Sequence, residues 1–591
     1  MRNTTKLAPF GEISESFGDL FDQGIYYVDK TDFISYLIEQ KRKICVFTRP
    51  RRFGKTLMLR TLQTFFEYRL DKDGKPIDNR RYFEGLKVMD AGEDVLKHLG
   101  QYPVISISLK DVSGESYESI VASMRKSVYD ACQPHLSLLL NHPALLDEEK
   151  EQFRRYATRK ASDKELKSFL GDMCVWLNRI TSQKVVILLD EYDVPLQQAA
   201  IYDIHHPQSE LFERTVRLIG KFISTGFKSN DNLAFGIIAG CMRVAKESIF
   251  TGMNNPGVIT VVDRIPNEFW GFTPKEVEDM LAYYGLSDQM DALKNWYDGY
   301  YYSNREVYNP WSLLNAIRGL VEGYGDDAIQ AYWSMTSSND IIDDMINNHP
   351  EYREELARLM EGGTKWVKVY KDLSYRDLNS RPDAIWSFLL FTGYLKSLSV
   401  RKDEDDLLEA EVTVPNREIL TVMKSAMRNW WEKICLPSFS VQSLLTAFWK
   451  KDTETIESEF INILMSGISV FDYKEDFYHG MVMGLLSSVC LPRSNAEHGE
   501  GRPDIVAIVD KKALLLELKC VTPKMLKEAN AEEDRKKIES MMTSALDEAE
   551  HQIDLKKYTD GVAIHYPAAK AIYCYALCFC RKQCKVRVID K

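Results

Sequence analysis

The sequence contains no long apolar segment and no sign of a secretory leader. No stretch approaches the roughly 18 consecutive apolar residues that cross a bilayer, and residues 1–10 lack the basic and then apolar order of a signal peptide. We therefore expect a cytoplasmic protein with no membrane partner. The sequence also contains no internal repeat and no low-complexity tract. Its hydrophobic fraction of 45% and charged fraction of 28% are near globular averages, which fits neither wholesale disorder nor a fibrous repeat.

Cysteine is too sparse for a disulfide framework. The chain has 11 cysteines among 591 residues, and their odd number and wide spacing are typical of reduced intracellular thiols. Four of them gather near the C-terminus, at Cys574, Cys578, Cys580 and Cys584. No C-x2-C pair with a partner pair occurs there. The alternation of small and large side chains from Tyr573 to Cys580 instead predicts a buried strand.

The chain also lacks an excess of positive charge. It has 76 Lys and Arg against 87 Asp and Glu, a net charge of -11, so any nucleic-acid site must be a local basic surface. We expect this surface near the C-terminus, where one acid, Asp590, accompanies five cations. The cations are Arg581, Lys582, Lys585, Arg587 and Lys591.

The pattern of apolar residues predicts an α/β protein of several domains, as 591 residues also indicate. Helix-length segments separate apolar runs, which is typical of a parallel sheet covered on both faces. The runs are residues 44–48, 103–109, 185–189, 234–239 and 258–262. From residue 271 helices dominate, and Thr273-Pro274-Lys275-Glu276 predicts a capping box with proline at the first helical position. We expect an NTPase core over 1–270, a helical lid over 271–365, a middle region over 366–454 and a C-terminal α/β domain over 455–591.

A phosphate-binding loop is indicated between a strand and a helix. The apolar run 44–48 leads into the sequence Arg49-Pro50-Arg51-Arg52-Phe53-Gly54-Lys55-Thr56 and then into Leu57, within a helical pattern. In such a loop backbone N–H groups hold phosphates, Lys55 reaches the β and γ oxygens, and the Thr56 hydroxyl binds Mg²⁺. Arg49 stands where the usual motif has its first glycine. The arginines from Arg49 to Arg52 could pair with phosphate oxygens, or bind acids of the helical region and couple it to nucleotide.

A second element supports NTP binding. The apolar strand 185–189 ends in Asp190 and Glu191, where Asp190 is expected in the Mg²⁺ shell and Glu191 beside the attacking water. For an isolated strand, two acids that merely begin a loop would be the simpler interpretation. Arg243, after the run 234–239, is a candidate to stabilise charge at the γ-phosphate. The sequence has no N-K-x-D motif for guanine, so we expect ATP.

A metal-dependent nuclease site is indicated in the C-terminal domain. Asp504 opens one strand, Asp510-Lys511-Lys512 predicts a tight turn, and Glu517 and Lys519 share one face of the next strand. The two carboxylates and the Leu518 carbonyl offer oxygen ligands for Mg²⁺, and Lys519 can orient the attacking water. A Glu and a Lys two residues apart usually lie on a solvent-exposed face of a strand. Here, however, they stand at the end of an otherwise apolar strand, which favours a functional site.

Flanking helices supply further candidates for this site. Glu475 and His479 lie four residues apart on one predicted helix, where a third metal ligand or a base could come from. Gln552 and Tyr558 follow on a later helix and could position a substrate phosphate. The simpler alternative is that they cap the helix or belong to its packed core.

At these residues the chain resembles a bacterial family that joins an AAA-ATPase-like domain to a PD-(D/E)XK nuclease domain. The arginine-rich loop 49–56 is the most specific element, and the resemblance makes Arg49 a family feature. Further shared motifs are residues 27–31, 190–196, 296–300, 308–312 and 478–480. The resemblance implies a P-loop core of the additional-strand class and a restriction-endonuclease-like C-terminal domain that carries Asp504, Glu517 and Lys519.

The sequence thus predicts an ATP-regulated, Mg²⁺-dependent nuclease, with ATP and Mg²⁺ as cofactors. Nucleic acid is the expected partner, with DNA favoured over RNA, and a homo-oligomer is allowed. The alternative is an NTP-dependent switch whose nuclease-like domain only binds nucleic acid. The intact set of Asp504, Glu517 and Lys519 favours the enzyme, because a module kept for binding alone need not retain all three.

Overall fold

The computed structural model divides the chain into two compact units. Residues 1–333 and 366–418 form the first, and residues 334–365 and 419–591 form the second. This division cuts across the expected lid and middle regions, whose boundaries stay predictions. The structure describes residues 8, 16–70, 75–206, 208–242, 249, 256–263, 268–302, 305–333, 352–371, 373, 381, 383–434, 441–467, 475–487, 489–490, 492–494, 503–521 and 531–590.

The first unit contains a five-stranded parallel sheet in the order β2-β3-β4-β1-β5. Its strands are β1 (Ile44–Thr48), β2 (Val104–Ser108), β3 (Val185–Asp190), β4 (Leu233–Gly240) and β5 (Gly257–Ile259). Each coincides with one of the five predicted apolar runs, although β5 is shorter than expected. Because β4 lies between β1 and β3, the order is that of the additional-strand class.

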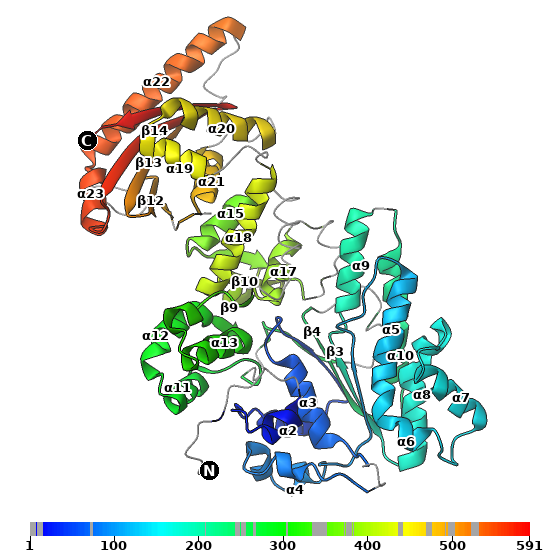
Figure 1. Cartoon of the computed structure of the whole chain (residues 1–591). Helices are drawn as coiled ribbons and strands as arrows, with labels where there is room; N and C mark the ends of the chain where they lie inside the picture. The colour runs from blue at the N-terminus through cyan, green and yellow to red at the C-terminus, as the bar shows by residue number, and fades with distance from the viewer. Residues whose placement is uncertain are drawn as a thin grey trace. The chain divides into compact units, whose positions relative to one another are not determined.

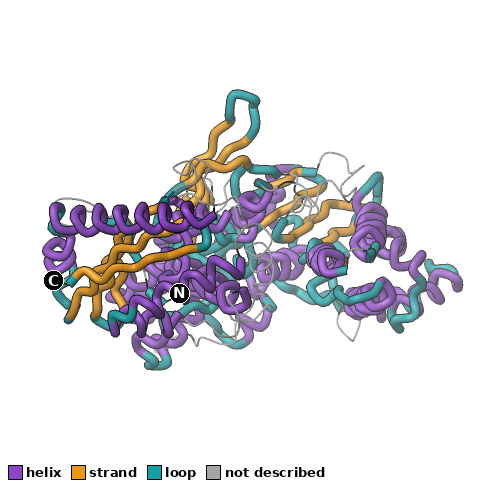
Figure 2. Tube along the Cα trace, turned by 90° about the horizontal axis from the view of Figure 1, so that it is seen from above, coloured by secondary structure: helices purple, strands orange, loops and turns teal. Residues whose placement is uncertain are grey.

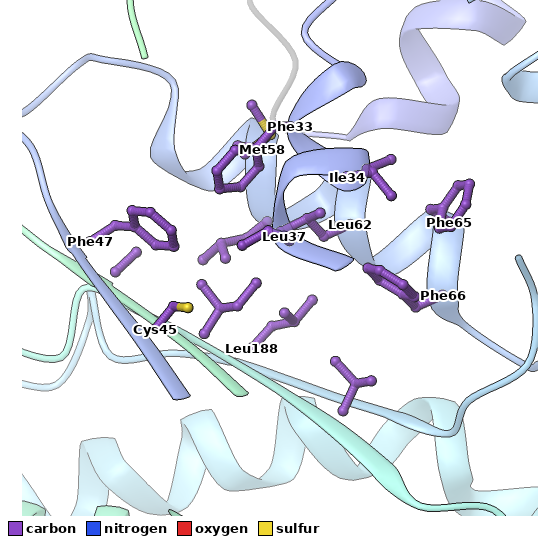
Figure 3. Packing of buried hydrophobic residues seen from close by; sticks show 14 of the residues in the cluster. Phe33, Ile34, Leu37, Cys45, Phe47, Met58, Leu62, Phe65, Phe66 and Leu188 are labelled. Atoms are coloured by element: carbon purple, nitrogen blue, oxygen red, sulfur yellow. The ribbon is translucent and has the colours of Figure 1, made fainter. Parts of the chain in front are cut away.

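Helices cover both faces of this sheet (Figure 1). Figure 3 shows one face, where α2 and α3 pack against β1 and β3 through side chains such as Phe33, Leu62, Phe66, Phe47 and Leu188. The opposite face is covered by α5, α8 and α10. The helices of this core are α1 (Phe17–Asp22), α2 (Asp32–Gln40), α3 (Lys55–Phe66), α4 (Glu93–Leu96), α5 (Tyr117–Cys132), α6 (Leu136–Leu139), α7 (Asp147–Tyr156), α8 (Asp163–Thr181), α9 (Val194–His205) and α10 (Leu211–Phe227).

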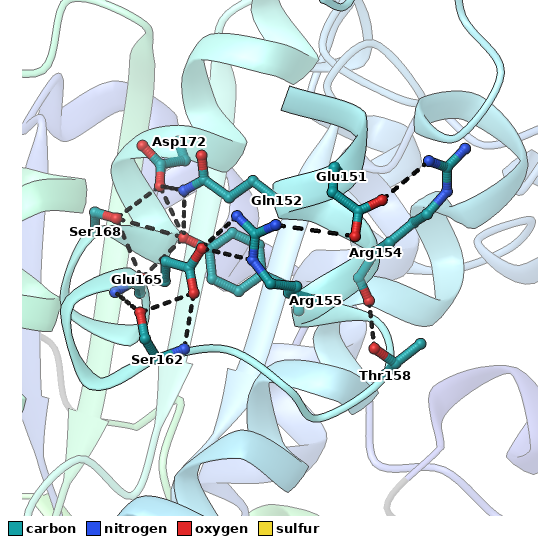
Figure 4. A network of polar contacts seen from close by, with 10 residues as sticks. Glu151, Gln152, Arg154, Arg155, Thr158, Ser162, Glu165, Ser168 and Asp172 are labelled. Atoms are coloured by element: carbon teal, nitrogen blue, oxygen red, sulfur yellow. Dashed lines mark hydrogen bonds and ion pairs between the residues drawn. The ribbon is translucent and has the colours of Figure 1, made fainter. Parts of the chain in front are cut away.

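A polar network joins α7 to α8 (Figure 4). Arg155 pairs with Glu165 at 2.6 Å, and Glu165 also completes the capping box of α8 with Ser162. The Asp172 carboxyl accepts hydrogen bonds from Gln152 and from the Tyr156 hydroxyl, each at 2.8 Å. These polar contacts add to the aromatic packing of Phe153 and Tyr156 against α8, where both side chains are fully buried.

The region expected to form a lid, which we continue to call the lid, begins with α11 (Pro274–Tyr284), and the structure confirms the predicted cap of this helix. The Thr273 hydroxyl accepts a hydrogen bond from the Glu276 N–H, and the Glu276 carboxylate accepts one from the Thr273 N–H. The lid continues through α12 (Met290–Tyr297), β6 (Tyr300–Tyr302), β7 (Arg305–Val307) and α13 (Pro310–Val321). The first unit then includes α17 (Ala384–Thr392) and a three-stranded sheet of β8 (Lys365–Lys368), β10 (Leu408–Thr413) and β9 (Lys396–Lys402).

The second unit contains a mixed sheet in the order β11-β12-β13-β14-β15. Strands β13 and β14 are parallel and the other pairs are antiparallel. Its strands are β11 (Arg493–Ser494), β12 (Ile505–Val509), β13 (Lys512–Cys520), β14 (Ala571–Cys580) and β15 (Gln583–Ile589). Asp510 and Lys511 both have positive φ, 49° and 62°, so they form the predicted tight turn between β12 and β13.

Helix α22 packs along the strands of this sheet, where Figure 2 shows it as the long helix near the C-terminus. Cys574, Cys578 and Cys580 lie on the face of β14 that packs against it, each at most 3% exposed. The cysteines therefore occupy a buried strand, as predicted. The helices of this unit are α15 (Arg353–Met360), α18 (Arg417–Ile434), α19 (Val441–Lys450), α20 (Thr453–Gly467), α21 (Glu475–Ser487), α22 (Ala531–Leu555) and α23 (Tyr558–His565), with α18 beginning at the end of the first unit.

Over the part of the chain that the structure describes, no helix combines the length and the apolar character that a bilayer span needs.

Candidate nucleotide-binding and nuclease sites

The phosphate loop connects β1 to the N-terminus of α3. Gly54 caps the helix with φ of 76°, a left-handed conformation that favours glycine, and Lys55 is its first residue. The loop thus presents the N–H groups of the first helical turn, as anion binding requires. Leu57 follows in this turn, and its side chain packs against the core of the first unit.

The side chains expected to bind nucleotide and Mg²⁺ come together at the ends of β1 and β3. The Thr56 hydroxyl donates a hydrogen bond of 2.6 Å to the Asp190 carboxylate. The Lys55 ammonium donates to the carbonyl oxygens of Arg49 and Pro50, at 3.1 and 2.9 Å, and is almost fully buried. Burial, followed by the Asp190 charge, raises the pKa of Glu191. A raised pKa favours Glu191 as an acceptor of a proton from water.

Asp193 is a functional candidate that sequence reasoning did not single out. Its carboxylate accepts the N–H groups of Cys241 and Met242, at 2.8 and 2.9 Å, and thereby holds the backbone just beyond β4. The Tyr192 hydroxyl donates to the Met242 carbonyl. The spacing of Asp190 and Asp193, two acids three residues apart at the end of a strand, was the sequence signal that could have pointed to Asp193. Arg243, the next residue after Met242, lies outside the described residues.

Arg49 lies inside the protein, away from the position expected for a phosphate ligand. It is 0% exposed, and its guanidinium donates to the carbonyl oxygens of Thr48 and Ile259, at 2.7 and 3.2 Å. It also lies over the rings of Trp270 and Tyr302. Burial lowers the pKa of Arg49 to about 10, which still leaves it charged at neutral pH. In this conformation the Arg49 side chain anchors the loop instead of facing a nucleotide.

Two more loop residues contact aromatic side chains of the lid. The Phe53 ring is 4.9 Å from that of Tyr300 and 5.5 Å from that of Tyr302, measured between centroids. The Arg52 guanidinium lies 4.3 Å from the centre of the Trp311 ring. Two residues at variable positions of the loop, Arg52 and Phe53, therefore join it to the shared motifs at 296–300 and 308–312.

The nuclease candidates meet at the ends of β12 and β13. The Asp504 carboxylate accepts the Leu518 N–H at 2.7 Å, which places Asp504 beside the strand segment 517–519. Glu517 is 0% exposed although it carries a carboxyl group, and the Lys519 ammonium is 3.5 Å from it. Burial raises the pKa of both carboxyl groups, and their mutual repulsion raises that of Glu517 further.

The neighbouring helices hold this set in place. The Lys519 ammonium donates to the Gln552 side-chain oxygen at 2.9 Å, and the Gln552 amide lies 3.3 Å from the Tyr558 hydroxyl. On α21 the Nε2 atom of His479 is 3.2 Å from the Asp504 carbonyl oxygen, so this ring contacts the backbone of a candidate ligand. Glu475 begins α21, but its side chain lies outside the described residues.

The residues present fit a divalent cation. One Glu517 oxygen is buried without a hydrogen-bond partner, which is costly for a carboxylate and is relieved by a cation. Among the described residues no three Asp, Glu, His or Cys side chains gather as a metal cluster. A cation here would be held by Asp504, Glu517 and the Leu518 carbonyl, which leaves ligand positions for water and substrate.

The C-terminal cations differ from the expected basic surface, because α22 neutralises two of them. Arg587 pairs with Asp547 at 2.6 Å and with Glu550 at 3.0 Å, and Lys585 pairs with Glu539 at 2.8 Å. These partners lie more than 30 positions earlier in the sequence, and their charge reduces the excess of positive charge that the segment alone would give. Binding of nucleic acid by the segment stays a prediction.

Comparison with known proteins finds family matches for two parts of the chain. Residues 12–250 match the predicted AAA-ATPase family, and residues 473–588 match the PD-(D/E)XK nuclease superfamily. A curated relative, the "Uncharacterized protein in vnfD 5'region" of Azotobacter chroococcum mcd 1, is 26% identical over 341 residues. The match covers 57% of this chain and 55% of the relative, so the chain spans about half the length of that protein.

No solved structure matches the chain. The two family matches coincide with the phosphate-loop sheet and with the mixed sheet that carries Asp504, Glu517 and Lys519. The chain therefore joins an AAA-ATPase-like domain to a C-terminal domain of the PD-(D/E)XK nuclease superfamily.

Proposed function

We propose that this protein binds and hydrolyses ATP, that its C-terminal domain is a Mg²⁺-dependent nuclease acting on DNA, and that the nucleotide state controls cleavage. The observation that carries the nuclease assignment is the fully buried Glu517 carboxyl, with one oxygen unpaired, beside Asp504 and Lys519. A protein has little reason to bury a carboxyl group completely beside a second, half-buried one unless a ligand compensates their charge.

The nuclease residues have separate roles in this proposal. Asp504, Glu517 and the Leu518 carbonyl hold Mg²⁺, which, when bound, lowers the pKa of a coordinated water and neutralises charge on the phosphodiester. Lys519 orients the attacking water, and Gln552 keeps the Lys519 ammonium at the strand end. His479 fixes the backbone of Asp504 through its contact with the carbonyl oxygen.

In the ATPase domain, Lys55 and the loop backbone bind the phosphates. Thr56 and Asp190, which already share a hydrogen bond, hold the Mg²⁺ that accompanies ATP, and Glu191 accepts a proton from the attacking water. Asp193 holds the backbone of Cys241 and Met242 in place, and these two residues directly precede Arg243.

A continuous set of contacts supports control of cleavage by nucleotide. Phe53 in the phosphate loop contacts Tyr300, whose ring centroid is 6.4 Å from that of Trp333. The Trp333 N–H donates to the Glu418 carboxyl at 3.0 Å. Glu418 is the last residue of the first unit, and the chain enters the second unit at residue 419. A loop movement on ATP binding can thus reach the segment of chain that leads to the nuclease.

Cleavage assays test both parts of the proposal. Purified protein is incubated with plasmid, linear DNA and RNA of the same sequence, with and without Mg²⁺ and ATP. We expect Mg²⁺-dependent cleavage of DNA whose rate changes when ATP is added. Tyr300→Leu should keep ATP binding and cleavage but lose the response to ATP. Binding of nucleic acid without any cleavage would favour the switch alternative, and an unchanged ATP response in Tyr300→Leu would refute this route of control.

A further inference from the structure

Among the described cations of residues 581–590, Arg581 and Lys582 make no ion pair with a described side chain of α22, and both lie in the two-residue turn between β14 and β15. Cys580 pairs with Gln583 across the strands, so Arg581 and Lys582 form the loop. Arg581 is exposed and Lys582 is half-exposed. Arg581 has φ of 51°, a left-handed conformation in which Gly, Asn or Asp is normally favoured. The protein thus places a long cation where the backbone prefers a small residue.

The pairing register places this turn beside the catalytic strand end. In the parallel pair of β13 and β14, Lys519 lies opposite Cys578, and the Val521 N–H donates to the Phe579 carbonyl at 2.9 Å. Arg581 is three residues beyond Cys578, which corresponds to about 10 Å along a strand at roughly 3.3 Å per residue. An arginine side chain at that position can contact a backbone phosphate close to one held at Lys519.

Tyr478, a residue of α21, contacts the β14–β15 turn and holds it in place. Its hydroxyl donates to the Arg581 carbonyl oxygen at 2.8 Å, and its ring is stacked on Phe579 with centroids 4.7 Å apart. The Tyr478 side chain is 1% exposed. The next residue, His479, contacts the Asp504 carbonyl oxygen. One short segment of α21 therefore fixes both the turn and the candidate metal ligand, which gives the shared motif at 478–480 a physical role.

We propose that the turn of Arg581 and Lys582 binds a backbone phosphate of the nucleic-acid substrate next to the phosphodiester that is cleaved. Tyr478 is its positioning residue. The inference rests on the proposed nuclease function, and it names the part of the domain that holds the substrate strand. Contacts to the phosphate backbone carry no base specificity, so this turn raises affinity for any sequence.

The test measures how binding of labelled DNA depends on salt. The full-length protein is titrated in EDTA, so that nothing is cut, with a labelled DNA strand, its duplex and the same RNA sequence. Each phosphate contact contributes about 0.7–0.9 to the slope of log affinity against log salt. Arg581→Ala with Lys582→Ala removes the contact with one phosphate and should therefore lower the slope by about 0.7–0.9. The matched control, Lys585→Ala with Arg587→Ala, removes two cations that α22 already neutralises and should leave the slope nearly unchanged.

Cleavage kinetics and Tyr478→Phe complete the test. The turn variant should raise KM and leave kcat unchanged, and Tyr478→Phe, which keeps the ring stack, should shift KM in the same direction with an unchanged melting temperature. An unchanged slope and KM in the turn variant, or an equal loss in the control, overturns this inference alone. If the wild-type protein binds none of the nucleic acids and cleaves none with Mg²⁺ present, the nuclease function itself fails.

Discussion

Replacing Arg49 with methionine separates two roles for the residue that most distinguishes this phosphate loop. If the guanidinium binds phosphate, its removal weakens ATP binding and leaves the fold intact. If it anchors the loop, as its complete burial indicates, the removal destabilises the first unit. Methionine suits the experiment because it retains most of the apolar volume while it deletes the charge and the donors.

The structure gives the size of the expected effect. The hydrogen bonds to the carbonyl oxygens of Thr48 and Ile259 involve a charged donor, which contributes about 1.5–3 kcal/mol each. The contacts with Trp270 and Tyr302, at 5.8 and 5.5 Å, add about 0.5–1 kcal/mol each. Against this, burial lowers the pKa of Arg49, so part of the gain from these contacts only offsets the cost of removing the cation from water. We therefore expect Arg49→Met to lower the free energy of unfolding by about 2–4 kcal/mol.

Urea unfolding followed by tryptophan fluorescence measures this loss, and calorimetry measures ATP binding under conditions where the variant is folded. Arg51→Met is the matched control, because Arg51 is half-exposed and donates to the Gln197 side chain. The control should change stability by less than about 1 kcal/mol. Unaltered unfolding of Arg49→Met together with at least a tenfold loss of ATP affinity would refute the anchoring role.

Other side chains give further predictions. Lys55→Ala should lose ATP binding, whereas Glu191→Gln should bind ATP without turnover, so the two variants should shift DNA cleavage in opposite directions; equal activity with ATP present would contradict nucleotide control. Lys519→Ala should keep Mg²⁺ binding, measured by calorimetry, while cleavage slows by about 10²–10⁴-fold; parallel loss of metal binding would show a structural role. Burial lowers the pKa of His135 to about 4 from 6.5. As the pH drops, His135 is protonated in the unfolded chain at a higher pH than in the folded protein. The free energy of unfolding should therefore fall between pH 6.5 and 4, by up to roughly 3 kcal/mol. His135→Gln should flatten that part of the pH profile of urea unfolding, and an unchanged profile would argue against a buried neutral imidazole.

Local patterns made much of the fold predictable. The five apolar runs became the five strands of the parallel sheet, and Thr273 and Glu276 formed the expected capping box. The turn at Asp510 and Lys511 formed where charged residues separate two apolar runs. These features depend on side-chain alternation and on hydrogen bonds between residues a few positions apart, which a sequence displays directly.

The surroundings of the candidate sites depend on contacts between distant residues, and there prediction was weaker. Arg49 follows a strand in a phosphate loop, so a phosphate-binding role was the natural expectation. Its carbonyl partner at Ile259 and its ring partner at Trp270 lie more than 200 positions further along the chain. The pairing of Arg587 with Asp547 likewise depends on how α22 lies on the sheet. Such partners cannot be read from composition or spacing.

The most direct test of the central claim is cleavage by Glu517→Gln. The substitution keeps the size of the side chain but removes the charge that would hold Mg²⁺. The assay compares this variant with wild type and with Glu548→Gln, an exposed glutamate on α22, on DNA with Mg²⁺ present. We predict that Glu517→Gln loses cleavage while folding and ATP binding persist, and that Glu548→Gln cleaves as wild type does. Wild-type cleavage by Glu517→Gln would contradict the nuclease assignment.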